Sequence, residues 1–257
     1  GLKLLVEDNK VVGFEPRYDF PVNEGRLCPK GVTAYLQTHH PDRLEYPLIK
    51  RNGVFERASW DEALDLVVSK FKKLQEVHGK DSIAVYSGSS LTTEKTYLVG
   101  KFARLGLGTR YIDYNGRLCM ASAAAGNNKA FGIDRAANPW SDIPFAEVLI
   151  IAGANCAETF PIINGFLWKQ RDNGGVWIVI DPRETATARQ GDIHLQLKPG
   201  TDAAVTNGLL NVLINEDLLD QAFIDSRTND WEATRETALK YTPDVASQIS
   251  GVPAEKI

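Results

Sequence analysis

VLIIAGAN at residues 148–155 and VWIVIDPR at residues 176–183 are the stretches that decide the fold of this 257-residue chain. Each begins with a run of Val, Ile, Leu or Trp and ends in residues that favour a turn. Residues 162–171, between them, have apolar side chains at the spacing of an amphipathic helix. Strands of a parallel sheet show such continuous apolar runs because helices cover both faces of the sheet. The two stretches therefore predict a βαβ unit and an α/β fold.

The same alternation continues along the chain in both directions. Strands are expected at residues 82–86 and 193–197, helices at 94–105 and 203–214, and a more polar helical tail at 219–241. Successive βαβ units of this kind predict parallel sheets of the doubly wound, Rossmann-like type.

The start of another helix is marked by Ser59-Trp60-Asp61-Glu62, which has the pattern of a capping box. In such a box the Ser59 hydroxyl accepts the backbone N–H of Glu62, and the Glu62 carboxylate accepts that of Ser59. Apolar residues at 63, 64, 67, 68, 71 and 74 then continue one face. Upstream, residues 1–58 are rich in Pro, Gly, Arg and His and predict a small β-meander with loops.

Composition excludes several classes of function. The chain has 29 Lys and Arg against 33 Asp and Glu, a net charge of -4, which does not favour binding to nucleic acid or an anionic membrane. No apolar run approaches the ~18 residues that a membrane-spanning helix needs. The 3 cysteines are odd in number and far apart, which favours reduced thiols and therefore a cytoplasmic location.

The ends of the two central strands carry residues suited to a nucleotide. Gly153 follows the first strand, where a glycine lets the backbone approach a phosphate, and Asp181 and Arg183 follow the second. Asp181 is placed to accept hydrogen bonds from ribose hydroxyls, and Arg183 is placed to neutralise the charge of a phosphate. The alternative is that Gly153 only closes a tight turn. Neither a Gly-x-Gly-x-x-Gly motif after a strand nor a P-loop motif is present, which disfavours a standard nicotinamide or P-loop site.

Lys198-Pro199-Gly200-Thr201-Asp202 follows the next expected strand and opens a helix. Thr201 or Asp202 would be the N-cap of this helix. On the residues alone, the stretch is either a further ligand-binding loop or only a strand-to-helix turn.

Two cysteines stand in settings that could support chemistry. Cys28 precedes Pro29 and Lys30, and a neighbouring lysine favours a thiolate, the form that iron–sulfur clusters require. One cysteine cannot hold a cluster, so its partner ligands would have to lie outside this sequence. Cys119 follows Arg117 and stands before a helix of small residues, so both Arg117 and the helix start would stabilise its thiolate. Cys119 is then either a soft metal ligand or a buried structural cysteine.

The remaining candidates point to structural roles. Cys156 is expected in the core, and the 4 histidines form no zinc or Cys–His pattern. No Gly-x-Ser-x-Gly nucleophile motif is present.

An ordered set of motifs resembles the molybdopterin oxidoreductases that use bis(molybdopterin guanine dinucleotide), such as nitrate reductases and formate dehydrogenases. The resemblance covers nearly the whole chain and is far more specific than any single motif. The motifs are Leu27–Gly31, Arg43–Leu48, Ser59–Leu64, Arg117–Ala123, Gly153–Glu158, Asp181–Arg183 and Lys198–Asp202.

The resemblance implies roles for individual positions. Cys28 is similar to the last cysteine ligand of a [4Fe-4S] cluster, and Lys30 to the residue between cluster and pterin on the electron path. Cys119 is similar to the molybdenum ligand, and Met120 to a residue that lines the substrate pocket in nitrate-reducing members. The positions that resemble contacts to the guanine dinucleotide tails are Gly153, Asn155, Glu158, Asp181, Arg183, Gly200 and Asp202.

The resemblance also implies three domains. Residues 1–58 would be a remnant of the [4Fe-4S] domain, and residues 59–145 and 146–257 the first and second α/β cofactor-binding domains. The family's Cys-x-x-Cys-x-x-x-Cys run does not occur here, and the chain starts at Gly1 with 1 methionine in all. We therefore expect a fragment of a catalytic subunit that is inactive alone.

The implied activity is reduction of nitrate to nitrite by oxygen-atom transfer. The sequence Arg-Leu-Cys-Met-Ala-Ser around Cys119 resembles assimilatory nitrate reductases, whereas a histidine follows the cysteine or selenocysteine of formate dehydrogenases. The implied electron donor is a ferredoxin, a flavodoxin or an NADH-linked reductase. Two alternatives remain: a formate dehydrogenase, with formate as substrate, and a non-catalytic electron-transfer or interaction module.

Overall fold

The computed structural model describes residues 1–257, which form two compact units. The first unit contains residues 1–37 and 138–257, and the second contains residues 38–137. The division into domains after residues 58 and 145 stays a prediction.

The first unit is built around a three-stranded parallel sheet. Its strands are β7 (Val148–Ala152), β8 (Val176–Ile180) and β9 (Ile193–Leu195), in the order β7-β8-β9. The bounds of β7 and β8 agree with the apolar runs of the sequence, and β9 ends two residues earlier than the expected strand. The parallel pairing confirms the predicted α/β class.

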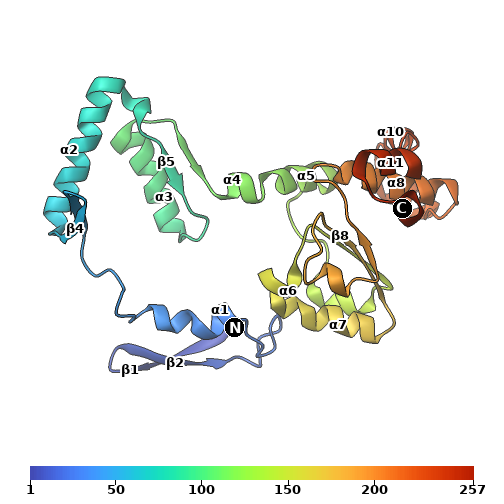
Figure 1. The fold of residues 1–257 in the computed structure, drawn as a ribbon, viewed down its shortest axis with the longest axis horizontal. Coiled ribbons are helices and arrows are strands. Elements are labelled where there is room, and N and C mark those ends of the chain that lie inside the picture. Colours follow the sequence, from blue (N-terminus) through green and yellow to red (C-terminus); the bar gives the residue numbers. More distant parts are fainter. The chain divides into compact units, whose positions relative to one another are not determined.

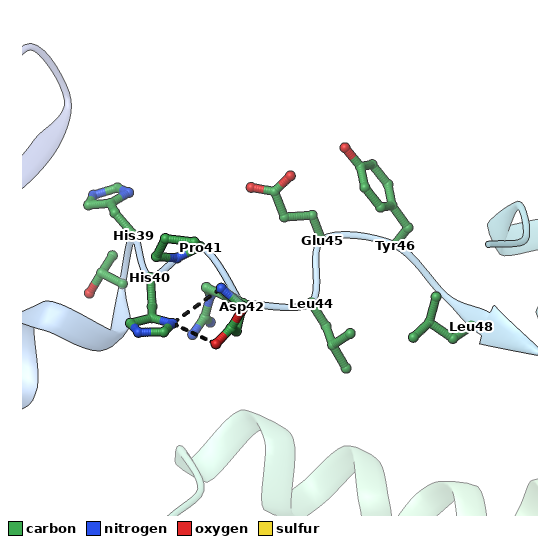
Figure 2. Close-up of a pocket in the computed structure, with 10 residues that line it drawn as sticks. His39, His40, Pro41, Asp42, Leu44, Glu45, Tyr46 and Leu48 are labelled. Atoms are coloured by element: carbon green, nitrogen blue, oxygen red, sulfur yellow. Dashed lines mark hydrogen bonds and ion pairs between the residues drawn. The ribbon is translucent and has the colours of Figure 1, made fainter. Parts of the chain in front are cut away.

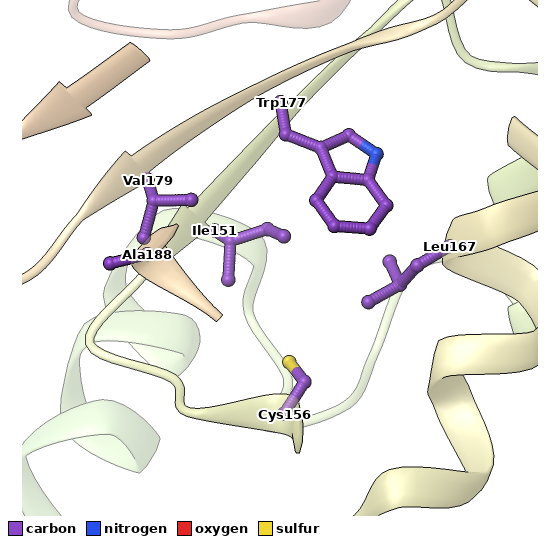
Figure 3. Close-up of a cluster of buried hydrophobic side chains, with 6 residues drawn as sticks. All are labelled: Ile151, Cys156, Leu167, Trp177, Val179 and Ala188. Atoms are coloured by element: carbon purple, nitrogen blue, oxygen red, sulfur yellow. The ribbon is translucent and has the colours of Figure 1, made fainter. Parts of the chain in front are cut away.

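Helix α7 (Asn164–Asp172) is held against this sheet by an apolar cluster and by one buried amide. Gln170 is 0% exposed, accepts the indole N–H of Trp177 at 2.8 Å and donates to the backbone oxygen of Ala146 at 2.9 Å. The side chains of the cluster come from the strands β7 and β8, from α7 and from the first residues of two short helical turns, α6 and η6 (Figure 3): Ile151, Cys156, Leu167, Trp177, Val179 and Ala188. Cys156 is therefore a core residue, as the sequence indicated.

The other helices of this unit follow the predicted pattern with shifted ends. The helix expected at 162–171 begins as a 3-10 turn at Pro161, because proline favours the first turn of a helix. The polar tail divides into two helices, and Thr228 in extended conformation ends the first of them. The remaining elements are η4 (Trp140–Phe145), α6 (Cys156–Thr159), η5 (Pro161–Ile163), η6 (Ala188–Gln190), α8 (Asp202–Asn215), α9 (Gln221–Arg227), α10 (Trp231–Ala238), α11 (Pro243–Ser250) and η7 (Ala254–Lys256).

Residues 1–37 contribute a hairpin and a short helical segment to the first unit. Strands β1 (Leu2–Glu7) and β2 (Lys10–Pro16) pair antiparallel around a turn at Asp8 and Asn9, which both have positive φ. Helix α1 (Pro29–Thr33) and turn η1 (Ala34–Gln37) follow. The β-meander expected over residues 1–58 is therefore wrong in one respect, because the next two strands pair only with each other.

The second unit contains a hairpin of β3 and β4, called the second hairpin, and a two-stranded parallel sheet of β5 and β6 (Figure 1). In chain order its elements are β3 (Leu48–Arg51), β4 (Val54–Arg57), α2 (Trp60–His78), η2 (Lys80–Ser82), β5 (Val85–Ser87), α3 (Thr93–Lys101), η3 (Phe102–Leu107), β6 (Ile112–Tyr114), α4 (Gly116–Cys119) and α5 (Ala121–Phe131).

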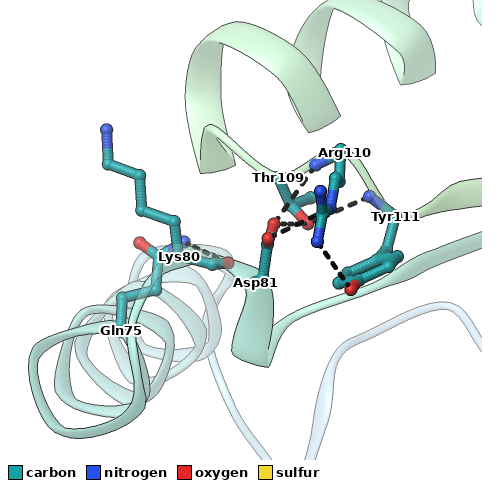
Figure 4. Close-up of polar contacts among 6 residues, drawn as sticks. All are labelled: Gln75, Lys80, Asp81, Thr109, Arg110 and Tyr111. Atoms are coloured by element: carbon teal, nitrogen blue, oxygen red, sulfur yellow. Dashed lines mark hydrogen bonds and ion pairs between the residues drawn. The ribbon is translucent and has the colours of Figure 1, made fainter.

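Two predicted elements of the second unit were wrong at their ends. The strand expected from residue 82 starts only at Val85, because Lys80–Ser82 form a 3-10 turn that the contacts of Asp81 stabilise. The Asp81 carboxylate accepts the Thr109 hydroxyl at 3.3 Å and the Arg110 backbone N–H at 3.4 Å (Figure 4). The helix expected over 94–105 is α-helical only to Lys101 and continues as a π-helix, which ends at Gly108 with φ +65°.

The predicted capping box at the start of α2 is half formed. The Ser59 hydroxyl accepts the backbone N–H of Glu62 at 3.2 Å, as expected. The Glu62 carboxylate instead forms an ion pair with Arg51 on β3. This pairing joins the second hairpin to the first turn of the helix.

Replacing Ser59 with alanine is expected to lower the free energy of unfolding of the second unit by about 1 kcal/mol, because an N–H of the first turn loses its acceptor. Ser69→Ala is the matched control, since Ser69 lies inside the same helix and bonds only to the Leu66 carbonyl oxygen of the preceding turn. Urea unfolding followed by circular dichroism measures both. Equal midpoints for the two variants would show that the cap does not contribute.

Candidate functional site

The carboxyl ends of β7, β8 and β9 form one edge of the parallel sheet in the first unit. Each strand is followed by a loop that carries residues predicted from the sequence to contact a nucleotide. The structure therefore brings the three loops to one edge, the position at which ligands bind in open α/β sheets. The residues placed there are Gly153, Asn155, Glu158, Asp181, Arg183, Gly200 and Asp202.

Two glycines give these loops their conformation and leave space beside the backbone. Gly153 has φ +61° and Gly200 has φ +83°, values that L side chains rarely adopt. A Cβ atom added to either residue would meet no atom within 4 Å. The conformation requires glycine, and the open space beside the backbone fits the close approach of a phosphate.

The loop after β7 is fixed by a buried threonine that the sequence analysis did not identify. Thr187 is 3% exposed, and its hydroxyl donates to Asn155 Oδ1 at 3.0 Å and accepts the backbone N–H of Ala157 at 3.1 Å. Asn155 thereby uses its side-chain oxygen within the protein. Thr187 lies six residues after Asp181 within a short polar stretch, and this proximity to the end of β8 is the only indication of its role in the sequence.

Asp181 is the most enclosed charged residue at this edge, with 6% of its surface exposed. Its Oδ1 atom accepts the backbone N–H of Arg183 at 2.8 Å, which bends the chain directly after β8. Its backbone oxygen accepts a hydrogen bond from His194 Nε2 at 2.9 Å. His194, on β9, therefore has a structural role in supporting the loop. The Arg183 side chain is exposed and available to an anion.

The third loop confirms Thr201 as the residue that precedes α8. Its hydroxyl donates to the Lys198 carbonyl oxygen at 2.6 Å instead of capping the helix. Asp202 begins the helix and is exposed. The Lys198 backbone N–H in turn donates to Ser250 at 2.8 Å, which ties the loop to α11.

The segment that contains Cys28 and Lys30 belongs to the same unit. Cys28 is the N-cap residue of α1, and the pKa of its thiol is lowered, first by the backbone N–H of Gly31 and also by the backbone and charge of Lys30. The Lys30 ammonium donates to the backbone oxygen of Thr159 at 3.4 Å, at the end of α6. This contact places Lys30 beside the helix that carries Glu158.

The pKa shift of Cys28 is testable by alkylation of the cluster-free chain. Because the thiolate is the reactive form, the rate for Cys28 should rise through a midpoint at lower pH than that of an ordinary thiol. Burial raises the pKa of the Cys156 thiol, so Cys156 is the internal control and should respond at higher pH. Mass spectrometry of iodoacetamide-labelled peptides measures both. A common midpoint would contradict the lowered pKa of Cys28.

Cys119 lies in the second unit, at the last position of α4 and directly before Met120 and α5. Its thiol is free and exposed, which excludes the alternative of a buried structural cysteine. Arg117 does not support this thiol as expected, because its guanidinium donates to Asp113 Oδ2 at 2.8 Å. The Arg117 hydrogen bond lowers the pKa of the Asp113 carboxyl. Met120 is 39% exposed and connects α4 to α5.

The second unit contains two pockets that the sequence did not predict. One, of about 420 Å³, lies at the carboxyl ends of β5 and β6 and is lined by Ser87, Ser89 and Asp113 among others. The other, of about 440 Å³, is formed by residues 38–48 (Figure 2). All of its lining residues come from one continuous stretch of chain that ends at Leu48, the first residue of β3. Within this stretch His40 Nδ1 lies 3.7 Å from Asp42 Oδ2.

The chain supplies isolated donor atoms, and not a complete set of ligands, for the cofactors that the resemblance implies. No three His, Cys, Asp or Glu side chains lie together in an arrangement that could hold a metal ion. Cys28, with its lowered thiol pKa, and the exposed Cys119 can each supply one thiolate. The edge of the β7-β8-β9 sheet provides an enclosed carboxylate and open glycine backbone, which fit a nucleotide tail.

The chain matches two known protein-family models. Residues 43–246 match the molybdopterin oxidoreductase family, and residues 1–40 match the molybdopterin oxidoreductase Fe4S4 domain. The chain belongs to the molybdopterin oxidoreductase family. The matches confirm the expected cofactors, molybdenum with bis(molybdopterin guanine dinucleotide) and a [4Fe-4S] cluster.

Curated relatives carry more than one activity in their names. The chain is 48% identical over 234 residues to the assimilatory nitrate reductase catalytic subunit of Bacillus subtilis, covering 90% of this chain and 33% of the relative. It is 40% identical over 257 residues to the F420-dependent formate dehydrogenase subunit alpha of Methanocaldococcus jannaschii, covering 100% of this chain and 37% of the relative. The chain therefore spans about a third of the length of these relatives.

A solved structure shows the same fold. Acetylene hydratase from Pelobacter acetylenicus superposes with a TM-score of 0.71 at 29% identity, over 99% of this chain and 36% of that chain. None of the helices described here has both the length and the apolar character needed to cross a membrane.

Proposed function

We propose that this chain is part of the catalytic subunit of a nitrate reductase, which converts nitrate to nitrite by oxygen-atom transfer. The observation that carries the proposal is the free, exposed thiol of Cys119, followed directly by Met120. The similarity to an assimilatory nitrate reductase over 90% of the chain supports it. The reaction takes up two electrons and two protons and releases water with each nitrite.

When bound, the molybdenum cofactor supplies the two-electron redox chemistry, and the iron–sulfur cluster supplies the electrons. In this proposal the Cys119 thiolate is a ligand of the metal, and Met120 lines the space for the substrate. Cys28 is a ligand of the cluster, and Lys30 lies on the path between cluster and pterin. The contact of Lys30 with Thr159, next to Glu158, supports this placement.

The three loops at the edge of the first sheet are proposed to bind the guanine dinucleotide tails. Gly153 and Gly200 let phosphate groups approach the backbone, and Arg183 neutralises their charge. Asn155, Glu158 and Asp202 complete the set of contacts, while Asp181 accepts hydrogen bonds from the nucleoside.

Asp181→Asn is expected to weaken the binding of guanosine monophosphate to the cofactor-free protein about tenfold, because one charge-assisted hydrogen bond becomes neutral. Asparagine keeps the oxygen that accepts the Arg183 N–H, so the turn after β8 is retained. Asp172→Asn, an exposed change at the end of α7, is the matched control. Calorimetry measures the affinity, and unchanged binding in Asp181→Asn would remove Asp181 from the proposed site.

The second candidate function is formate dehydrogenation, favoured by 40% identity over the full length of the chain to an F420-dependent formate dehydrogenase subunit. Assays of the intact protein with viologen dyes separate the two. Nitrate-dependent oxidation of reduced dye supports the nitrate proposal, and formate-dependent reduction of oxidised dye would replace it. Absence of molybdenum in elemental analysis would instead indicate a non-catalytic module.

Other parts of the proposal concern the cellular setting. We propose a ferredoxin, a flavodoxin or an NADH-linked reductase as electron donor, and a cytoplasmic location, consistent with 3 free cysteines. We also propose that the chain is inactive by itself, since it provides only single ligands for each metal centre. The three-domain division at residues 1–58, 59–145 and 146–257 belongs to the same proposal.

A further inference from the structure

The turn that carries Cys119 is attached to a neighbouring loop by one residue. The loop begins at Ser87, where β5 ends, and the turn begins directly after β6. The pocket at the ends of these strands is lined by Ser87 and Ser89 from the loop and by Asp113 and Tyr114, the last two residues of β6 before the turn.

Asn115 forms hydrogen bonds both to the loop after β5 and within the turn that carries Cys119. Its side-chain Oδ1 atom accepts the backbone N–H of Ser89 at 2.7 Å, and its backbone N–H donates to Ser87 at 3.3 Å. Its backbone oxygen accepts the N–H groups of Leu118 at 3.1 Å and Cys119 at 3.0 Å. The same residue therefore contacts the loop after β5 and closes the helical turn that ends at the cysteine.

We propose that Asn115 is the positioning residue that holds Cys119 in place relative to the loop after β5. This inference rests on the proposed role of Cys119 as the molybdenum ligand. Cys119 itself lies on the surface, with a free and exposed thiol, so burial in a core does not fix its position. The nearby ion pair between Asp113 and Arg117 lies within one segment, so it cannot join the turn to the loop.

Asparagine is suited to join the turn to the loop. The backbone of Asn115 is helical, with φ -57° and ψ -26°, so it can begin the turn of α4. Its short side chain presents a carbonyl oxygen to an N–H group on the neighbouring loop, as asparagine does at many turns. Aspartate has the same length and the same acceptor atom, whereas alanine has no acceptor.

The test compares Asn115→Ala, Asn115→Asp and the control Asn128→Ala, an exposed asparagine on α5, in the intact protein. In cofactor-free protein, amide hydrogen exchange at Ser89 should accelerate about fivefold to tenfold in Asn115→Ala, the effect of losing its hydrogen bond to Asn115 Oδ1. Exchange at Cys119 should also accelerate, because the turn that holds its N–H is no longer attached to the loop. Asn115→Asp should stay within about twofold of the parent, as should Asn128→Ala. In the loaded protein, Asn115→Ala should alter the Mo(V) electron paramagnetic resonance spectrum, and Asn115→Asp should restore it.

Unchanged exchange at Cys119 in Asn115→Ala, or an unchanged spectrum, overturns the inference. If Asn115→Ala does not fold, Asn115→Asp provides the test. Faster amide exchange at Ser89 or Cys119 in Asn115→Asp would also overturn the inference. The exchange measurement does not need molybdenum, so it tests the positioning separately from the proposed function. That function fails instead if Cys119→Ala leaves the Mo(V) spectrum unchanged.

Discussion

Turnover of the intact protein is expected to be lost when Cys119 is replaced with alanine. The thiolate is the one bond from this segment to the metal in the proposed site, and its loss should exceed the ~10–100-fold cost of removing a partner of a metal ligand. Since the Cys119 side chain is exposed, the substitution leaves no cavity, and the fold should be retained. Molybdenum content and nitrate reduction with reduced viologen are the measurements.

Cys156→Ala is the matched control for this experiment. Cys156 is 4% exposed in the core of the first unit, so its replacement should cost about 1 kcal/mol of stability and leave turnover intact. Retained nitrate reduction in Cys119→Ala would refute the assignment of the ligand. Equal loss in both variants would point to general damage to the protein.

The second large effect is expected for Trp177→Ala, which should lower the free energy of unfolding by about 3–5 kcal/mol. Trp177 is 2% exposed on β8 and packs against Trp168 with ring centroids 5.1 Å apart. Its removal leaves a cavity in the core and also deprives the buried Gln170 side chain of the indole N–H. Urea unfolding followed by near-ultraviolet circular dichroism measures the loss.

Trp60→Ala controls for the removal of an indole. Trp60 is 68% exposed at the start of α2, so its replacement should change stability by no more than about 0.5 kcal/mol. Similar losses for the two variants would show that burial of Trp177 does not determine its contribution.

Much of the sheet in the first unit could be predicted from sequence because β7 and β8 are continuous apolar runs, the pattern typical of parallel strands. Most of β8 is buried, whereas Val148 and Ile150 on β7 are more than half exposed. The start of β5 could not be predicted, because it depends on contacts of Asp81 with Thr109 and Arg110, which are distant in sequence. The change from α- to π-helix after Lys101 had no signal in the apolar spacing.

Some residues of the candidate site could also be predicted from the sequence, and others could not. Residues directly after a strand could be placed from sequence, because parallel strands end at a common edge. Thr187 and His194 could not, since each acts through a hydrogen bond to a loop from another strand. Arg117 was assigned to the wrong partner, although Asp113 stands four residues earlier, at the spacing at which opposite charges pair on a helix.

The buried amide of Gln170 restricts how the chain can vary within α7. Gln170 donates to the backbone oxygen of Ala146 before β7 and accepts the indole N–H of Trp177 on β8. With about 3.6 residues per turn, one residue added to or removed from α7 before Gln170 would rotate this side chain by roughly 100° about the helix axis and leave these polar groups buried without partners. Changes of chain length between β7 and Gln170 are therefore expected in the loops before α7 and not in the helix itself.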